Sequence, residues 1–285
     1  MTTDDHRTEF AAAVRAFARD RLAAGALERA HSHGYPWDAA KLLADQSLLG
    51  LTVPERDGGQ GGTLLDAVTA IQEVGMVCPK SADVVQAGNF GALRTFAEYA
   101  SDEQKARFLP GLLAGTALLG LAMSEPEAGS AVTDLTTSAT PEGDGYVVDG
   151  TKIWSTHSVE ATVYLVYVRF GPGVSGIGSV LVERGTPGLE IGRPSTYMSG
   201  EEWAELRFDA CRIPLRERAA RAGRVQTADQ RLQRGAPWQR RPLARAGPPC
   251  VHDRARARAG PSAVRSPAGG VPGHPMEVRR HGSRA

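Results

Sequence analysis

The sequence predicts an α+β fold in which an N-terminal α-helical domain is followed by a small β-barrel or sandwich domain and then by a largely disordered tail. Three observations support this prediction. Apolar residues recur at helical spacing up to about residue 120, short strand-like runs with turns follow over 121–214, and residues 215–285 have no usable period. We therefore expect a helical domain over 1–120, a middle β-domain over 121–214 and a non-native tail over 215–285.

Five helices are expected in the helical domain. In the first, Phe10 and Val14 lie four residues apart, and charged residues separate the apolar positions. Thr63 is placed to cap the third helix, and Ser101 with Gln104 has the spacing of a capping box at the start of the fifth. Four glycines and a proline over 54–62 indicate a loop. The expected helices cover 10–22, 37–49, 63–74 and 89–99, and the fifth begins after 101.

Short strands separated by turns are expected in the middle domain. The run 162–170 is rich in Val, Tyr and Leu, as is typical of a strand. Asp144 and Gly145 have the composition of a hairpin turn, and the sequence T-P-G at 186–188 indicates another turn. Further strands are expected over 177–182, 188–191 and 205–208.

Composition excludes several classes of protein. With 41% hydrophobic residues, the chain has enough apolar material for a packed core. No run approaches 18 consecutive apolar residues, so no membrane-spanning helix is expected. The acidic start lacks the apolar stretch of a secretory signal, and three widely separated cysteines form neither a disulfide framework nor a metal-ligand cluster. We expect a cytoplasmic protein with no metal site and no membrane partner.

The formal net charge of +1 conceals a strong asymmetry along the chain. Residues 1–214 carry 17 basic and 28 acidic side chains, whereas 215–285 carry 4 acidic and 16 basic side chains, all of the latter arginine. Such a basic segment is typical of an arm that binds nucleic acid. However, Arg, Ala, Gly and Pro make up 45 of its 71 residues, which is also the composition that GC-rich DNA gives in a wrong reading frame.

The most informative stretch is L-A-M-S-E-P-E-A-G-S at 121–130, which joins the helical region to the strand region. Its glycine and small residues would let a ligand approach the backbone closely. The hydroxyls of Ser124 and Ser130, together with free backbone N–H groups in such a turn, suit a phosphate or the polar edge of a ring. By spacing alone, an ordinary loop is the commoner explanation.

A second candidate stretch is D-G-T-K-I-W-S-T at 149–156. Here Trp154 stands beside the hydroxyls of Ser155 and Thr156. An aromatic side chain in this setting can stack on a flat cofactor, while the hydroxyls donate hydrogen bonds to the cofactor edge. The alternative is a core tryptophan whose indole N–H is satisfied inside the protein.

Taken together and in this order, the two stretches resemble the two signatures of the acyl-CoA dehydrogenase family. The resemblance covers about residues 5–214. Other matching segments are L-G-L-T-V-P-E at 49–55 with Gly58 and Gly59, E-Q-K at 103–105 with Leu109 and Pro110, T-P-G at 186–188, and Phe208 with C-R-I-P at 211–214.

The resemblance implies a helical domain, a β-domain and a C-terminal helical domain, with FAD as the cofactor. Leu121, Met123 and Ser124 would contact the flavin ring, with Ser124 near its N5 edge. Gly129 and Ser130 would lie toward the flavin and the pantetheine arm of the substrate, so Ser130 is also a candidate substrate-binding residue.

The second signature, through Trp154, Ser155 and Thr156, would cover the other side of the flavin ring. The activity implied is α,β-dehydrogenation of an acyl thioester, with FAD as hydride acceptor. The implied partners are acyl-CoA or an acyl-carrier thioester, an electron-transfer flavoprotein or similar acceptor, and further copies of the chain in a homo-oligomer. The family's base is a glutamate of the C-terminal helical domain, and nothing recognisable matches it here, so the catalytic residue stays unknown.

Two residues depart from the family pattern: Glu127 stands where Gly is common, and Ala131 stands where Asp is common. Glu127 places a Cβ and a carboxylate in a tight turn, and a positive φ there would cost about 1 kcal/mol. This departure bears on the substrate side of the site.

A slip of the reading frame accounts for the end of the resemblance at Pro214. With codons shifted one base forward, residues 276–277 must give Trp, residues 238–239 must give Gly, and 264–273 permits F-G-R-P-L-A-E-F-Q-G. These products resemble the first C-terminal helices of the family, in order and spacing. The alternative functions are an inactive, frame-shifted remnant that lacks the base and, less favoured, a basic nucleic-acid binder, since Trp238 is the tail's only aromatic residue. Resequencing the DNA at this point tests the slip.

Overall fold

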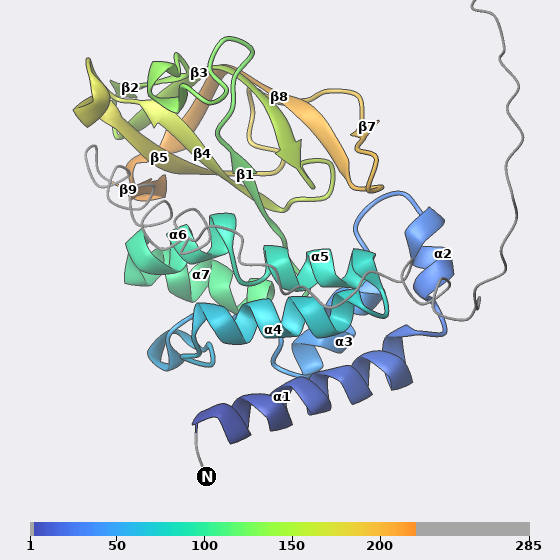
Figure 1. The fold of residues 1–285 in the computed structure, drawn as a ribbon. Helices are drawn as coiled ribbons and strands as arrows, with labels where there is room; N and C mark the ends of the chain where they lie inside the picture. Colours follow the sequence, from blue (N-terminus) through green and yellow to red (C-terminus); the bar gives the residue numbers. More distant parts are fainter. Residues whose placement is uncertain (1–2, 221–285) are drawn as a thin grey trace, which may run out of the picture. The chain divides into compact units, whose positions relative to one another are not determined.

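In the computed structural model, residues 3–220 are described, and within them the helices precede the strands along the chain (Figure 1). This order confirms the α+β fold, with a helical part followed by a β-sheet part. Of the tail predicted over 215–285, residues 221–285, with the shifted-frame strings named above, lie outside the described residues. The domain boundaries at 120 and 214 stay predictions.

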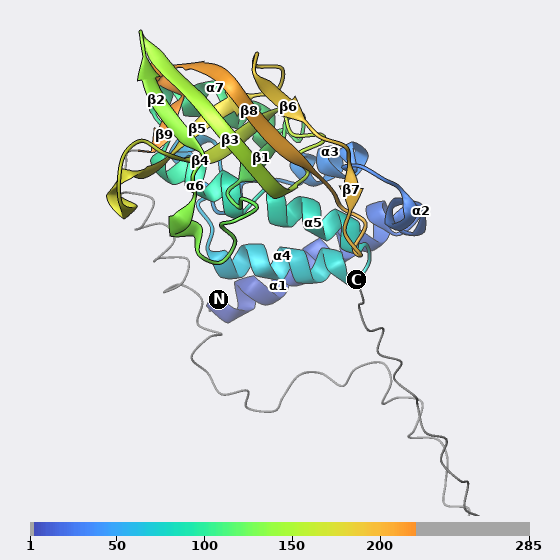
Figure 2. The ribbon, with the colours of Figure 1, turned by 90° about the horizontal axis from the view of Figure 1, so that it is seen from above.

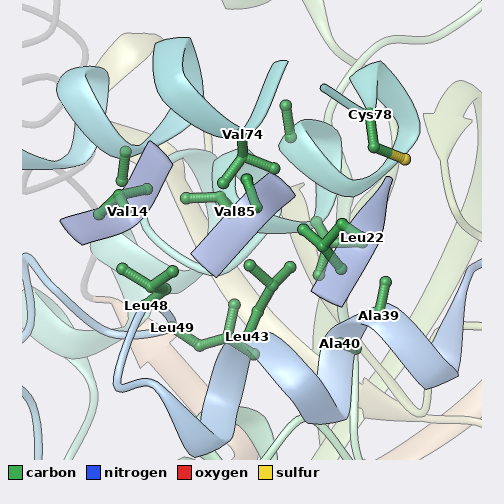
Figure 3. Close-up of a cluster of buried hydrophobic side chains, with 14 of the residues drawn as sticks. Val14, Leu22, Ala39, Ala40, Leu43, Leu48, Leu49, Val74, Cys78 and Val85 are labelled. Atoms are coloured by element: carbon green, nitrogen blue, oxygen red, sulfur yellow. The ribbon is translucent and has the colours of Figure 1, made fainter. Parts of the chain in front are cut away.

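The helices of the first part pack around a core of alanine, leucine and valine side chains (Figure 3). Val14, Leu22 and Leu43 lie in this core together with Val74 and Val85, so the first helix and its π-helical continuation pack against the helices that follow. The helices are α1 (Thr3–Phe17) with a π-helical turn (Ala18–Leu22), α2 (Ala26–His31), α3 (Trp37–Asp45), α4 (Leu64–Gly75), α5 (Pro79–Ala87), α6 (Gly91–Tyr99) and α7 (Asp102–Leu113), with a short 3-10 turn (Glu55–Asp57) in the predicted loop.

Both predicted helix caps are present. Thr63 N donates to the Asp66 carboxylate at 2.7 Å and Thr63 Oγ1 accepts from Asp66 N, so α4 begins directly after Thr63. Ser101 and Gln104 exchange the same pair of bonds at the start of α7, at 3.0 and 3.2 Å. Local sequence therefore sets where these two helices begin.

Some helix limits differ from the prediction because of left-handed backbone residues. The helix predicted over 37–49 ends at Asp45, since Ser47 has a φ of 56°. The helix predicted from 89 begins at Gly91, which has a φ of 54°. The apolar pattern predicts neither α2 nor α5; α5 buries Lys80 and Ser81, which break its apolar period.

The strands form one sheet in the order β6-β8-β3-β2-β4-β5-β9, with β1 beside β4 and β7 beside β8. β3 and β8 run antiparallel along most of their length (Figure 2). β4 and β5 are buried on both faces, because alternate side chains pack on α6 and α7 or against β3 and β8, which explains their unbroken apolar runs. The strands are β1 (Leu119–Ala122), β2 (Ser138–Glu142), β3 (Gly145–Thr156), β4 (Val163–Arg169), β5 (Ile177–Glu183), β6 (Leu189–Ile191), β7 (Ser195–Thr196), β8 (Glu202–Pro214) and β9 (Arg218–Ala220).

The turns of the sheet are close to the predicted places. The β2–β3 hairpin turns at Gly143 and Asp144, one residue before the predicted Asp144-Gly145 pair, because Gly143 takes the positive φ of 59°. The turn at 186–188 is confirmed. The strand predicted over 205–208 is only the middle of β8, most of whose exposed side chains are charged and which contains a bulge where Ala210 has a φ of 47°.

The first residues of the predicted tail belong to the fold. Residues 215–217 form a 3-10 turn, and β9 then pairs with β5. Buried Glu217 accepts a hydrogen bond from Arg107 of α7 at 2.6 Å, and Gln104 Nε2 donates to the Arg216 carbonyl at 2.6 Å. Contacts with α7 therefore continue past Pro214.

Candidate functional site

The end of β3 carries a bulge that turns Trp154 outward. Lys152 pairs with Leu206 and Ser155 with Ala204, so β3 has one residue more than β8 over this stretch. Trp154 has a φ of 58° and is 54% exposed, which rules out the alternative of a core tryptophan. The bulge thus presents an indole ring at the surface of the sheet.

The stretch 121–130 leaves β1 and closes a tight turn. Glu125 and Ala128 exchange backbone hydrogen bonds of 3.0 and 3.2 Å, which leaves Pro126 and Glu127 at the turn's tip. Glu127 is exposed and is not among the residues with positive φ, so the strain considered for this departure from the family pattern does not arise.

Three hydrogen bonds join the two candidate stretches residue by residue. Ile153 N donates to the Ser124 carbonyl at 2.9 Å. The Lys152 ammonium donates to the Met123 carbonyl at 3.1 Å and to Glu125 Oε1 at 2.8 Å. Residues separated by 27 to 29 positions in sequence therefore form one continuous surface that includes Trp154.

The Lys152–Glu125 ion pair at this junction is buried, and both of its members make further hydrogen bonds. Lys152 is 0% and Glu125 4% exposed. The carboxylate also accepts from Thr136 N at 2.6 Å, Thr136 Oγ1 at 2.8 Å and Thr137 N at 2.9 Å. These donors supply the compensation that a buried carboxylate needs.

Burial and hydrogen bonding act in opposite directions on this pair. Burial raises the pKa of the Glu125 carboxyl, but the bonds from Lys152, Thr137 and Thr136 outweigh it and lower the pKa to about 2. Burial lowers the pKa of Lys152 to about 8, with Glu125 opposing the shift. The pair is therefore ionised at pH 7.

The free energy of unfolding is expected to fall as the pH drops below about 4.5. The unfolded chain takes up a proton at Glu125 with the ordinary pKa of 4.5, whereas the folded chain resists until about 2, so this contribution is present above pH 4.5 and is lost as pH falls toward 2. Denaturant unfolding followed by circular dichroism should show a shallower acid dependence for Glu125→Gln than for the parent. Glu127→Gln, in the exposed tip of the same turn, is the control, and equal slopes for all three proteins would contradict the assignment.

A cavity of about 440 Å³ opens where the end of β3 meets α5, α6 and β1. Its walls mix apolar, aromatic and acidic side chains, among them Phe90, Leu121, Trp154, Thr156, Asp83 and Glu201. Such a mixture of apolar walls with a few polar groups is typical of a small-molecule site.

Three of the predicted site residues, Leu121, Trp154 and Thr156, line this cavity together. Met123 and Ser124 are half-buried at the junction with β3, where their carbonyls accept the bonds from Lys152 and Ile153.

The other predicted residues lie apart from the cavity walls. Gly129 and Ser130 are exposed in the loop that follows the 125–128 turn. Ser155 is 1% exposed, with its side chain on the buried side of β3, and its Oγ has no hydrogen-bond partner among the described residues. A contact from Ser155 to a ligand in the cavity would therefore use the backbone.

Sequence reasoning misses a histidine–aspartate pair in the cavity wall. His157 Nε2 and Asp83 Oδ2 of α5 are 2.6 Å apart, and His157 has a φ of 58°. His157 directly follows the second candidate stretch, which was the available signal. Asp83 lies on a helix that the apolar pattern does not predict. Tyr197 and Glu201 come from the turn before β8, and only the long-range strand pairing brings that turn to Trp154.

Among residues 3–220, no three His, Cys, Asp or Glu side chains are grouped as metal ligands. No helix in the same range combines the length and apolar character needed to span a bilayer.

Comparison with known proteins matches the chain to two family models. Residues 3–116 match "Acyl-CoA dehydrogenase, N-terminal domain", and residues 120–211 match "Acyl-CoA dehydrogenase, middle domain". Among curated proteins, acryloyl-CoA reductase (NADH) of Anaerotignum propionicum is 33% identical over 217 residues, which are 74% of this chain and 55% of that protein. The chain thus spans about half the length of the curated relatives it matches.

Two solved dehydrogenase structures are also similar to this chain. Butyryl-CoA dehydrogenase from Megasphaera elsdenii superposes with a TM-score of 0.70 at 26% identity, covering 79% of this chain and 61% of that one. A glutaryl-CoA dehydrogenase from Mycobacterium smegmatis in complex with FADH2 superposes with a TM-score of 0.68 at 25% identity, covering 77% and 56%.

Proposed function

We propose, from the premise that this chain belongs to the acyl-CoA dehydrogenase family, that it is a flavoprotein that binds FAD and performs α,β-dehydrogenation of an acyl thioester. The observation that carries this proposal is the junction of the two candidate stretches. Lys152 and Ile153 hold residues 123–125 against the β3 bulge, so that Leu121, Trp154 and Thr156 face one cavity.

The residues present fit a planar cofactor ring. Trp154 is held outward on a bulge with more than half of its surface free, although this leaves an aromatic side chain in contact with solvent. A Cβ built on Gly129 would meet no atom within 4 Å, so the loop after the turn is open to a ligand. We assign Leu121, Met123 and Ser124 to one part of the FAD site and Trp154 with Thr156 to the other.

The remaining predicted residues take supporting roles in this proposal. Gly129 and Ser130 would face the flavin and the pantetheine arm of the substrate, with Ser130 as the substrate-binding hydroxyl. Ser155 would contribute its backbone, because its side chain is buried.

The chain's own residues provide orientation and exclusion of water. FAD, when bound, supplies the hydride acceptor, as cofactors rather than side chains carry such chemistry. Trp154 and Leu121 would cover apolar ring surface, and the Thr156 and Ser124 hydroxyls would donate to polar ring edges. Among residues 3–220 we assign no catalytic base; the cavity carboxylates of Asp83 and Glu201 are hydrogen-bonded to His157 and Ser199.

Partners and location follow the family resemblance. We propose acyl-CoA or an acyl-carrier thioester as substrate, an electron-transfer flavoprotein or similar acceptor as redox partner, a homo-oligomeric assembly and a cytoplasmic location. The acidic balance of residues 1–214 supports a soluble enzyme rather than a nucleic-acid binder.

The proposal is tested by loading the purified full chain with FAD and adding acyl-CoA thioesters of several chain lengths without oxygen. Active enzyme is expected to lose the visible absorbance of its oxidised flavin upon substrate addition, because hydride transfer reduces the ring. Trp154→Ala should reduce both FAD retention and bleaching, whereas Met198→Ala, a fully exposed residue, should leave both unchanged. Bound FAD without any bleaching would contradict dehydrogenase activity.

A second candidate is an inactive, frame-shifted remnant of such an enzyme. The composition of 215–285 and the family-like strings of its shifted frame favour it. FAD binding without bleaching is the outcome it expects. Since residues 215–220 pack into the fold, resequencing should extend from the codon for Pro214 past that for Ala220, and an unbroken frame would overturn this candidate.

A further inference from the structure

Three aromatic side chains, Trp154, Tyr197 and Trp203, form a cluster at one end of β3 and β8. The Trp154 and Trp203 ring centroids are 4.2 Å apart, and the Tyr197 centroid lies 6.4 Å from Trp154 and 6.1 Å from Trp203. Tyr197 Oη also donates a hydrogen bond to the Trp154 carbonyl at 3.1 Å. Tyr197 and Trp203, which lie outside the candidate stretches, therefore both pack near the Trp154 ring, and Tyr197 also contacts its backbone.

The backbone of Trp154 needs such contacts. Its φ of 58° lies in the left-handed region, which a residue with a bulky side chain rarely adopts. A conformation of this kind persists only when the surrounding structure holds it, and such residues gather at functional sites. Here the surrounding structure includes, besides the strand pairing at the bulge, the tilted Trp203 ring and the Tyr197 hydroxyl.

A short hairpin carries both supports. Ser195 of β7 pairs with Trp203 of β8, and Trp203 pairs in turn with Thr156 of β3. Within the hairpin, Tyr197 N donates to the Glu201 carbonyl and Gly200 N to the Tyr197 carbonyl, each at 3.0 Å. The positions of Tyr197 and Trp203 are thus fixed relative to β3 by main-chain bonds.

The cluster divides into a cavity side and a supporting side. Trp154 and Tyr197 line the 440 Å³ cavity, whereas Trp203 is not among its lining residues. Trp203 can therefore influence a ligand in the cavity only indirectly, through the neighbours that line it, Trp154 and Tyr197.

We propose that Trp203 and Tyr197 are positioning residues, which hold Trp154 in its left-handed conformation and so preset the surface on which a flat cofactor ring packs. This rests on the proposed FAD site. If Trp154 left this conformation for part of the time, the apparent affinity for the ring would be the intrinsic affinity multiplied by the fraction of molecules that stay in it.

The first experiment measures the conformational state of the Trp154 side chain by fluorine NMR, in the absence of cofactor. The full chain is labelled with 5-fluorotryptophan, and its Trp154 resonance is identified by its loss in Trp154→Phe. The resonance is expected to be single in the parent and in Trp203→Phe, which keeps an aromatic partner, and to broaden or split in Trp203→Ala. Met198→Ala changes a fully exposed residue of the same hairpin and should leave the Trp154 resonance unchanged.

The second experiment measures the Kd for FAD by quenching of flavin fluorescence. Trp203→Ala is expected to raise the Kd about five- to tenfold, the range that loss of an aromatic pair supports. Trp203→Phe and Met198→Ala should stay within about twofold. Tyr197→Phe keeps the ring and removes only the hydroxyl, and is expected to raise the Kd about two- to threefold, in the range of a single hydrogen bond.

Two results would overturn the proposal. An unchanged Trp154 resonance in Trp203→Ala, with an unchanged Kd, would show that Trp203 does not position Trp154. If Trp203→Ala does not fold, an unchanged Kd and an unchanged Trp154 resonance in Tyr197→Phe would overturn the proposal instead. If the parent chain binds no FAD, both the proposed function and the cofactor part of this proposal are contradicted. The fluorine spectra still test independently whether Trp203 and Tyr197 hold Trp154 in its conformation.

Discussion

Replacing Lys152 by methionine is expected to lower the free energy of unfolding by about 3–5 kcal/mol, because it leaves the Glu125 carboxylate buried without its cation. The ammonium is fully buried and donates to both Glu125 Oε1 and the Met123 carbonyl, so its loss leaves two acceptors with fewer donors. Denaturant unfolding at pH 7, followed by circular dichroism, measures the change. The same substitution should also loosen the junction between residues 123–125 and β3, and with it the candidate site.

Two control variants separate the ion pair from a general effect of losing a lysine. Lys41→Met removes an exposed partner of Asp45, at 3.3 Å, and should change stability by no more than about 0.5 kcal/mol. Adding Glu125→Gln to Lys152→Met should recover part of the loss, because the amide carries no charge and its single oxygen can still accept from one of the two N–H groups, of Thr136 and Thr137, that donate to the two carboxylate oxygens. A loss under about 1 kcal/mol in the single variant Lys152→Met would contradict this account of the junction.

Gly150→Ala is expected to destabilise the protein by about 2–5 kcal/mol through backbone strain together with a steric clash. Gly150 has a φ of 145°, and a Cβ there would lie 2.5 Å from Thr137 Oγ1 and 2.7 Å from Thr137 Cα. Since Thr137 N donates to Glu125, displacement of Thr137 would also disturb the buried carboxylate. This explains why glycine precedes Thr151 and Lys152 in the second candidate stretch.

Gly143→Ala is the matched control for this effect. Gly143 also has a positive φ, 59°, but a Cβ built there meets no atom within 4 Å. It should therefore show only the strain, about 1 kcal/mol. Equal free energies of unfolding for the two variants, from the same denaturation experiment, would show that the clash with Thr137 contributes nothing.

Those parts of the fold that depend on neighbouring residues can be predicted from the sequence. Thr63 and Ser101 cap their helices as their spacing indicates, because a capping box needs only residues three positions apart. The apolar runs of β4 and β5 are recognisable because both faces of these strands are buried. Helix α5 is not recognisable, since it buries Lys80 and Ser81 among its apolar residues.

The candidate site likewise contains residues that the sequence predicts and residues that it does not. The two stretches and the residues Leu121, Trp154 and Thr156 are identified by their own sequence and by family resemblance, and the structure places these three on one cavity. Trp203 and Asp83 reach the site through strand register and helix packing, which no local pattern encodes. The outward turn of Trp154 depends on a bulge that arises only when β3 pairs with β8.

The measurement that most directly tests whether residues 121–130 and 149–156 form one cofactor-binding surface is an equilibrium titration of the purified full chain with FAD. Flavin fluorescence quenching should saturate at about one FAD per chain, the stoichiometry of a single preformed pocket. Trp154→Ala should weaken binding about tenfold or more. Absence of saturable binding by the parent chain, or an unchanged affinity in Trp154→Ala, would contradict the assignment of this surface to FAD.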